Sequence, residues 1–272
     1  MEAKCEFKDI DYIAVTVGPG LVGALLVGIA YAKALAYSLD IPIVPVHHIE
    51  GHIAANYISN ADLKPPFMSL VVSGGHSHLI YVKDYTEFEI IGRTRDDAVG
   101  EAFDKVARTL GLGYPGGPEV SKMAQQGTPT YKLPKTKFDN FDFSFSGIKT
   151  SVINIAHKEK DNLVIENMCA SFENTVCETL VDNTIDAMKK LGINKVVLAG
   201  GVSANRKLRE LIQVESKANG FISYMPELKY CTDNAAMIAS AAHFNYINKI
   251  KYDIEDKLDL NAYPGLKVGE KR

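Results

Sequence analysis

Histidines are concentrated in one part of the chain, since five of the seven lie between His47 and His78. His48 and His52 are four residues apart, a spacing that puts both imidazoles on one face of a helix, about 5 to 6 Å apart at Cβ. Such a pair can bind one metal ion if a further ligand comes from elsewhere in the chain. Glu50 does not directly follow the first histidine, unlike the glutamate of zinc proteases. A helix start with solvated histidines is the alternative.

Two glycine-rich turns could hold phosphate or nucleoside groups. The first turn joins two expected strands and consists of Val71, Val72, Ser73, Gly74 and Gly75. Its backbone N–H groups could cradle phosphate oxygens, although a plain hairpin turn has the same residues. The second turn, at residues 198–206, joins a strand to a helix start, where an adenosine or phosphate group is favoured. Asn205 could add a side-chain hydrogen bond, but tight packing of strand and helix also calls for glycine.

Acidic residues form a further cluster. Asp97, Glu101 and Asp104 have helical spacing and could simply be a solvated face paired with Lys105 or Arg108. Asp233 precedes an expected helix, where it is either the N-terminal cap or the third metal ligand.

The elements that must position these residues follow a strand–helix–strand order. Residues 13–17 form a β-branched strand that ends at Gly18-Pro19-Gly20. A helix rich in alanine and leucine, a strand at 43–46 and a helix from His47 follow, which predicts an α/β sheet with parallel pairs. After Pro65-Pro66, residues 67–72 and 78–82 predict a hairpin. Later predictions are helices at 162–191, 204–215 and 233–242 and a strand at 195–199.

Residues 105–149 have a different composition. They include four prolines, several glycines, and seven Lys or Arg against three Asp or Glu. We expect a long, irregular basic loop, which is typical of functional or mobile segments. Its lysines could contact nucleic-acid phosphates: Lys122, Lys132, Lys135, Lys137 and Lys149.

Length and composition limit the classes of protein. The chain has 272 residues, 46% hydrophobic residues and a net charge of -3. These values exclude wholesale disorder and a histone-like polycation, and they allow one large domain or two lobes. The four cysteines form no Cys-x-x-Cys pair, which favours a reduced, cytoplasmic protein. The uncharged run 12–32 is long enough to cross a bilayer, but its central Gly-Pro-Gly favours a buried strand, a turn and a buried helix in a soluble chain.

Taken together, the sequence resembles the TsaD family of tRNA N(6)-adenosine threonylcarbamoyltransferases, also called glycoprotease-like proteins. Eight motifs in order over nearly the whole chain carry the resemblance, at residues 18–23, 47–52, 72–75, 96–105, 114–118, 143–149, 199–206 and 232–234. The resemblance implies an actin-like (ASKHA, hexokinase/Hsp70 type) fold of two α/β lobes. The family's opening strand and phosphate loop have no counterpart here, so we expect an incomplete N-terminal lobe made of 1–66 with 234–272, and a C-terminal lobe at 67–233.

The resemblance also implies the chemistry. Family members transfer the threonylcarbamoyl group of threonylcarbamoyl-AMP to N6 of adenosine 37 in tRNAs reading codons that begin with A, and release AMP. Their metal ligands fall on His48, His52 and Asp233, for one divalent ion, iron or zinc. Their nucleotide or substrate contacts fall on Val71 to Gly75, Asp104, Gly117 and Asn205, while no residue stands out as the catalytic base. The partners would be tRNA, threonylcarbamoyl-AMP or ATP, a paralogous TsaB-type protein and a small TsaE-type ATPase. We expect no association with a membrane.

Two positions depart from the family pattern. Many relatives carry Asp where this chain has Ser121, which puts a ribose contact there in question. Archaeal and eukaryotic relatives have a metal-ligating Tyr where this chain has Val71. The competing functions are an O-carbamoyltransferase or kinase of the same fold, a metalloprotease, and an inactive fragment or nucleotide-binding subunit.

Overall fold

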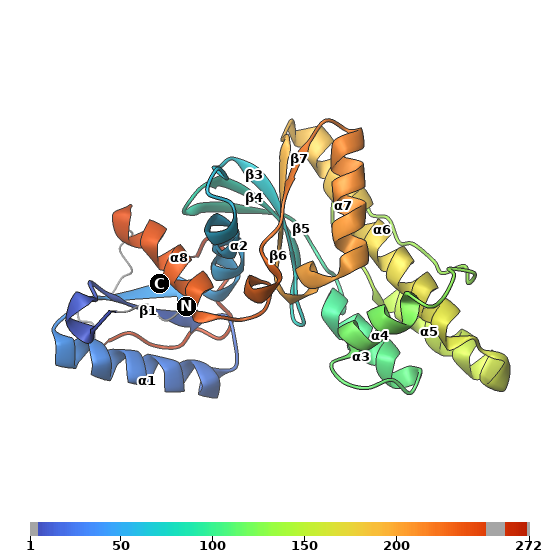
Figure 1. Cartoon of the computed structure of the whole chain (residues 1–272), viewed down its shortest axis with the longest axis horizontal. Coiled ribbons are helices and arrows are strands. Elements are labelled where there is room, and N and C mark those ends of the chain that lie inside the picture. Colours follow the sequence, from blue (N-terminus) through green and yellow to red (C-terminus); the bar gives the residue numbers. More distant parts are fainter. Residues whose placement is uncertain (1–4, 249–258, 271–272) are drawn as a thin grey trace.

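The computed structural model describes residues 5–248 and 259–270. The first elements are a short 3-10 helix at Phe7–Asp9, strand β1 (Ile13–Gly18), helix α1 (Val22–Leu39), strand β2 (Ile43–His47) and helix α2 (His48–Ser59). β1 and β2 pair in parallel, with Ile13 opposite Ile43, as the strand–helix–strand order predicted. α1 lies along one face of this small sheet (Figure 1).

α1 is not the buried helix that we expected. It buries Leu25, Ile29 and Ala32 against β1, whereas its opposite face leaves Val27 73% and Tyr31 70% exposed. By length and composition α1 is the one helix of the described residues that could cross a membrane, and 22% of it is buried within the described chain. The sequence pattern therefore identified the helix but overstated its burial.

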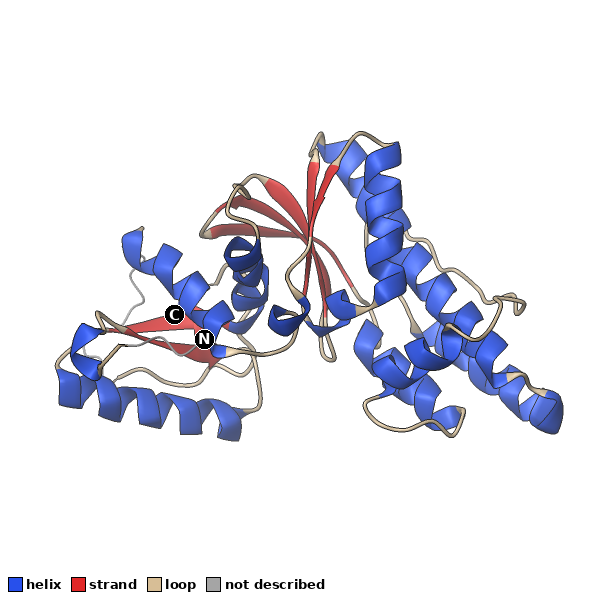
Figure 2. Ribbon diagram, in the orientation of Figure 1, coloured by secondary structure: helices blue, strands red, loops and turns tan. Residues whose placement is uncertain are grey.

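A five-stranded sheet forms the centre of the molecule (Figure 2). Its order is β5-β4-β3-β6-β7, with β3 at Phe67–Val72, β4 at Ser77–Asp84, β5 at Glu87–Arg93, β6 at Lys195–Ala199 and β7 at Ile222–Tyr224. β3 pairs antiparallel with β4 and parallel with β6. The predicted hairpin and the strand at 195–199 are confirmed, and β5 and β7 are additional.

Helices cover both faces of this sheet because the side chains of its strands alternate. Met68, Leu70 and Val72 of β3 pack in a core with α3 (Val99–Thr109), α4 (Gly116–Ala124), α5 (Ser146–Glu159), α6 (Ile165–Leu191) and α7 (Arg206–Ala218). Phe67 and Val71 face the other way, toward α2. β3 is buried on both faces and can carry a site only at its ends.

The predicted loop at 105–149 is in part wrong. It contains the end of α3, all of α4 and the start of α5, and its remaining residues connect these helices. Pro115 occupies the N-cap position of α4 and Pro118 lies in its first turn, where the missing N–H of proline breaks no helical hydrogen bond. The prolines therefore start a helix here rather than prevent one.

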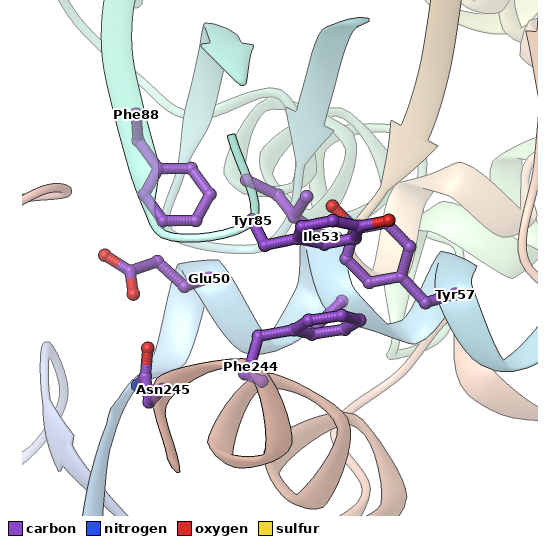
Figure 3. Close-up of a pocket in the computed structure, with 9 residues that line it drawn as sticks. Glu50, Ile53, Tyr57, Tyr85, Phe88, Phe244 and Asn245 are labelled. Carbon is purple, nitrogen blue, oxygen red and sulfur yellow. The ribbon is translucent and has the colours of Figure 1, made fainter. Parts of the chain in front are cut away.

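An aromatic joint connects α2, the β4–β5 turn and α8 (Ala235–Ile247) (Figure 3). The rings of Tyr85 and Phe244 stack with centroids 4.3 Å apart, and Tyr57 tilts against both. The cavity beside them measures about 10 Å³, which is roughly the volume one water needs. These rings pack α2, the β4–β5 turn and α8 against one another, and the cavity beside them is too small for a substrate.

The remaining elements are short 3-10 helices at Lys160–Asn162, Gly201–Ala204 and Leu228–Tyr230. The lobe boundaries at residues 66 and 233 stay a prediction, and residues 1–4, 249–258 and 271–272 of the predicted N-terminal lobe lie outside the described part.

Candidate functional site

The start of α2 presents two histidines on one face. His47 ends β2, and its Nδ1 accepts a hydrogen bond from the Ile49 backbone N–H at 3.1 Å, so His47 caps the helix. His48 and His52 then lie one turn apart, with ring centroids separated by 4.8 Å. The spacing in the sequence therefore gives the shared helix face that we expected.

Asp233 approaches these histidines from the far end of the chain. Its Oδ1 lies 3.6 Å from Nε2 of His48 and 3.2 Å from Nε2 of His52. The ligand atoms of all three side chains lie within 4.8 Å of one another. Two imidazole nitrogens and one carboxylate oxygen suit iron or zinc and leave coordination positions open. The three residues therefore fit a single divalent metal ion.

Close packing of α2 on α8 creates this meeting. A Cβ added to Gly51 would lie 2.7 Å from Cδ1 of Ile238, so glycine lets the two helices approach. Asn234 caps α8, because its Oδ1 accepts from the Met237 backbone N–H at 2.8 Å. The cap is therefore Asn234, which leaves the Asp233 carboxylate directed at the histidines.

Electrostatics favour the ligand forms of these groups. Burial, helped by the neighbouring His52, lowers the pKa of His48 below its ordinary value, so this imidazole stays uncharged at neutral pH. The hydrogen bond from His52 lowers the pKa of Asp233, which keeps the carboxylate ionised. A metal ion needs neutral imidazole and ionised carboxylate, so little proton release would accompany binding.

The first glycine-rich turn lies at the carboxyl end of β3. Val71 and Val72 have buried side chains, so only their backbone could meet a ligand. Ser73 closes the turn, since its Oγ accepts from the His76 backbone N–H at 3.1 Å. Gly74 and Gly75 are exposed and nothing described lies within 4 Å of an added Cβ. This open backbone is suited to phosphate oxygens.

The second glycine-rich turn packs against the first. Gly200 has φ +87° and an added Cβ would lie 2.4 Å from the Val72 carbonyl oxygen, so only glycine fits there. The carboxyl ends of the parallel strands β3 and β6 therefore meet, which is where open α/β sheets bind ligands.

The start of α4 involves the next two predicted site residues, Asp104 through a hydrogen bond and Gly117 in its own first turn. The Gly116 N–H donates to Oδ1 of Asp104 at 2.7 Å, so the Asp104 side chain holds the first turn of α4. Gly117 follows with open space around it. Asp104 thus acts on the helix start in this structure and is not paired with a cation among the described residues.

Asn205 lies at the start of α7, where its Oδ1 accepts from the Leu208 backbone N–H at 2.9 Å. Its Nδ2 donates to Ser121 Oγ at 2.9 Å and to Glu173 Oε1 at 2.7 Å. Glu173 could not be recognised as a site residue from the sequence, because one acid in a long helix belongs to no motif.

Several of the lysines that we expected to bind phosphates form ion pairs with acidic side chains of the protein. Lys135 lies 2.7 Å from Glu178, Lys137 3.0 Å from Asp186 and Lys149 2.5 Å from Asp97. Lys105 also pairs with Asp97 at 2.8 Å. Although burial alone would raise it, the hydrogen bonds from Lys105 and Lys149 hold the pKa of Asp97 below its ordinary value. Within the described residues, Lys122 and Lys132 form no such pair.

A metal-competent triad and a glycine-lined strand edge lie on a mixed α/β frame, which fits the actin-like fold that the sequence resemblance implies. Solved structures share this fold, and at their level of identity they show the fold alone. Full-length HypF in its phosphate- and nucleotide-bound form has a TM-score of 0.65 at 19% identity, covering 87% of this chain and 39% of that one. HypF from T. kodakarensis has a TM-score of 0.69 at 13% identity, covering 88% and 41%.

Sequence comparison defines the family. The family model described as TsaD, tRNA N6-adenosine threonylcarbamoyltransferase, matches residues 1–240. Curated proteins with that name from Clostridium kluyveri and Clostridium botulinum strain 657 are 53% and 52% identical, and one from Clostridioides difficile strain 630 is 50% identical. Each match covers 99% of this chain and 80% of the relative. The chain belongs to the TsaD family of transferases, and the resemblance carried by its motifs is confirmed.

Proposed function

We propose that this protein transfers the threonylcarbamoyl group of threonylcarbamoyl-AMP to N6 of adenosine 37 in tRNAs reading codons that begin with A. The observation that carries the proposal is the convergence of His48, His52 and Asp233 on one point, in a chain 53% identical to a relative named for this transfer. In the reaction, adenine N6 forms a bond to the carbonyl carbon of the threonylcarbamoyl group. The bond from that carbon to the phosphate oxygen of AMP breaks, AMP leaves, and N6 loses a proton to solvent.

The proposed metal site uses three side chains of fixed direction. His47 fixes the first turn of α2, and Asn234 fixes the start of α8, so both helix ends that carry the ligands are held without the ion. A bound iron or zinc ion would supply Lewis-acid polarisation of a carbonyl, or a hold on the threonyl carboxylate. The ligands Asp233, 77% exposed at its side chain, and His48, 23% exposed, leave the site open to a substrate.

The proposed adenylate site lies at the edge where β3 and β6 end. Backbone N–H groups of the turn from Val71 to Gly75 would bind the phosphate, and Gly117 would let the nucleoside approach α4 without a Cβ in the way. Asp104 would act by holding the α4 start, and Asn205 by its amide. Such fixed donors stabilise negative charge that develops on a leaving phosphate.

The remaining parts of the proposal concern organisation and partners. The lobes would be 1–66 with 234–272 and 67–233, with the adenylate site on the second. tRNA, ATP, a TsaB-type paralogue and a TsaE-type ATPase would be the partners in the cytoplasm. With a net charge of -3, the protein would bind tRNA through local basic residues or through a partner surface.

The test is to incubate the protein and its partners with threonylcarbamoyl-AMP and unmodified tRNA and to measure AMP. We expect AMP release to depend on tRNA and to match the modified nucleoside mole for mole. AMP release without tRNA would indicate hydrolysis, and activity with carbamoyl phosphate in place of the adenylate would favour an O-carbamoyltransferase.

A further inference from the structure

Glu173 is a buried carboxylate that pairs with no cation of residues 5–248 and 259–270. It lies in the first half of α6 with 7% of its surface exposed, and its Oε1 accepts from Ser121 Oγ at 2.6 Å and from Asn205 Nδ2 at 2.7 Å. No lysine, arginine or histidine of the described chain forms an ion pair with it. A buried carboxyl group that pairs with no cation costs more free energy to bury than an apolar side chain of the same shape. Its presence therefore asks for a role beyond packing.

The Glu173 carboxylate sets the direction of two other side chains. Asn205 Oδ1 is engaged at the α7 N-terminus, so the amide must direct its Nδ2 hydrogens toward Ser121 and Glu173. The Ser121 hydroxyl gives its single hydrogen to Glu173 and accepts from Asn205 with one lone pair. One Ser121 lone pair remains, and the hydroxyl can only accept a further hydrogen bond.

The place of this cluster indicates what it would meet. Ser121 lies on α4, whose start is held by Asp104, and Asn205 directly follows the glycine-rich turn after β6. Both side chains are half-buried, while Glu173 lies behind them. A small ligand at this strand edge would meet an acceptor, Ser121 Oγ, and an amide, both fixed by the same carboxylate.

We propose that Glu173 is a positioning and selectivity residue through which Ser121 and Asn205 recognise the ribose hydroxyls of an adenine nucleotide. This inference rests on the nucleotide site of the proposed function. A ribose hydroxyl would donate a hydrogen bond to the remaining lone pair of Ser121. A ribose oxygen would also accept a hydrogen bond from the Asn205 amide, in place of one of the two that this amide now donates. Carboxylates at the ends of parallel strands recognise ribose directly in other nucleotide sites, whereas here the carboxylate acts through two neutral groups.

The test compares ATP with its 2′-deoxy and 3′-deoxy analogues by titration calorimetry. A site built around a hydroxyl discriminates against the analogue that lacks it, so we expect the wild type to bind one analogue about tenfold or more weakly than ATP. Glu173→Leu should bring the ratio of the two affinities near one, because it weakens the binding of ATP and leaves the binding of that analogue unchanged. Glu173→Gln should keep the ratio, because its amide oxygen accepts the same two hydrogen bonds.

Two further variants keep the test decisive. Ser121→Ala changes a half-buried hydroxyl on another helix and should lower the ratio even if Glu173→Leu folds poorly. Thr184→Val is the matched control, because Thr184 is fully buried on α6 and donates only to the Leu180 carbonyl at 2.7 Å. It should keep the wild-type ratio.

The outcomes separate this inference from the proposed function. If the wild type discriminates and both Glu173→Leu and Ser121→Ala keep its ratio, the inference is wrong and the nucleotide site stands. If the wild type binds ATP and both analogues equally, the inference is also wrong. If the wild type binds none of the three nucleotides, both the inference and the proposed nucleotide site are overturned.

Discussion

The Asp233 carboxylate lies 3.2 Å from the His52 imidazole although the two residues come from opposite ends of the chain. Asn234 makes this possible, because it caps α8 in place of its neighbour. A capping aspartate would direct its oxygens at backbone N–H groups. Because Asn234 caps the helix, the Asp233 carboxylate is available to the histidines and completes a metal-competent triad at the contact of α2 and α8.

Removing both histidines should abolish metal binding. We expect about one divalent ion per chain in the wild type and near zero in the His48→Ala/His52→Ala variant, because one carboxylate alone binds such ions weakly. Elemental analysis of purified protein measures this. His243→Ala, an exposed position on α8, is the control. Unchanged metal content in the double variant would place the ion elsewhere.

Loss of the α8 cap should affect both stability and the metal. Asn234→Ala removes the acceptor for the Met237 N–H, which typically costs about 1 kcal/mol of unfolding free energy. It also frees the loop that carries Asp233, so metal affinity should fall, whereas Asn234→Asp should retain most of both. Denaturant unfolding and metal titration provide the two readings. A lower stability with unchanged affinity would show that the cap does not orient Asp233.

Acid should destabilise the fold through His78. Burial, with smaller effects of His76 and Arg93, lowers the pKa of His78 from 6.5 to about 4. The unfolded chain therefore binds more protons between these values, so this stability is complete above pH 6.5 and is lost as pH falls toward 4. Between pH 7.5 and 5 the loss should be about 2 kcal/mol.

The variant His78→Gln isolates this effect, because glutamine has no proton to gain in that range. Its unfolding free energy, measured in denaturant at both pH values, should fall less on acidification than that of the wild type. An equal fall in the two proteins would mean that His78 accepts a proton in the folded state as easily as in the unfolded state.

Binding of tRNA should depend on the unpaired lysines of the 105–149 segment. Lys122 and Lys132 are exposed and form no ion pair with the described residues, whereas Lys135 and Lys137 are neutralised by acids on α6. Lys122→Glu/Lys132→Glu should weaken tRNA binding and reduce its salt dependence. Lys135→Glu/Lys137→Glu should weaken it less. Filter binding at several salt concentrations measures the loss of tRNA affinity in both variants. A larger loss in Lys135→Glu/Lys137→Glu than in Lys122→Glu/Lys132→Glu would assign the contact to the paired lysines.

Local patterns in the sequence predicted the parts of the fold that local patterns control. The mostly apolar run at 67–72 became a strand buried on both faces, and the four-residue spacing of His48 and His52 became one helix face. β5 was missed because its residues 87–93 are mostly exposed and include three charges. A continuous apolar signal does not exist for such a strand.

Contacts between distant segments could not be predicted in this way. The motif resemblance suggested Asp233 as the third ligand, but its capping alternative was resolved only by the position of Asn234 in space. Glu173 has no sequence signal, since its meaning depends on Ser121 and Asn205 from two other helices. Likewise, the charges of Lys135 and Lys137 look free in sequence and are paired in the fold.

The proposed function requires transfer to one nucleoside, and mapping of the modified position in the product is its decisive test. Unmodified tRNA is incubated with the protein, its partners and threonylcarbamoyl-AMP, then digested and analysed by mass spectrometry. We expect one threonylcarbamoyl group, on the adenosine at position 37, that disappears when this base is changed to guanosine and when His48 and His52 are both alanine. Modification at another position, or equal modification by the His48→Ala/His52→Ala protein, would contradict it.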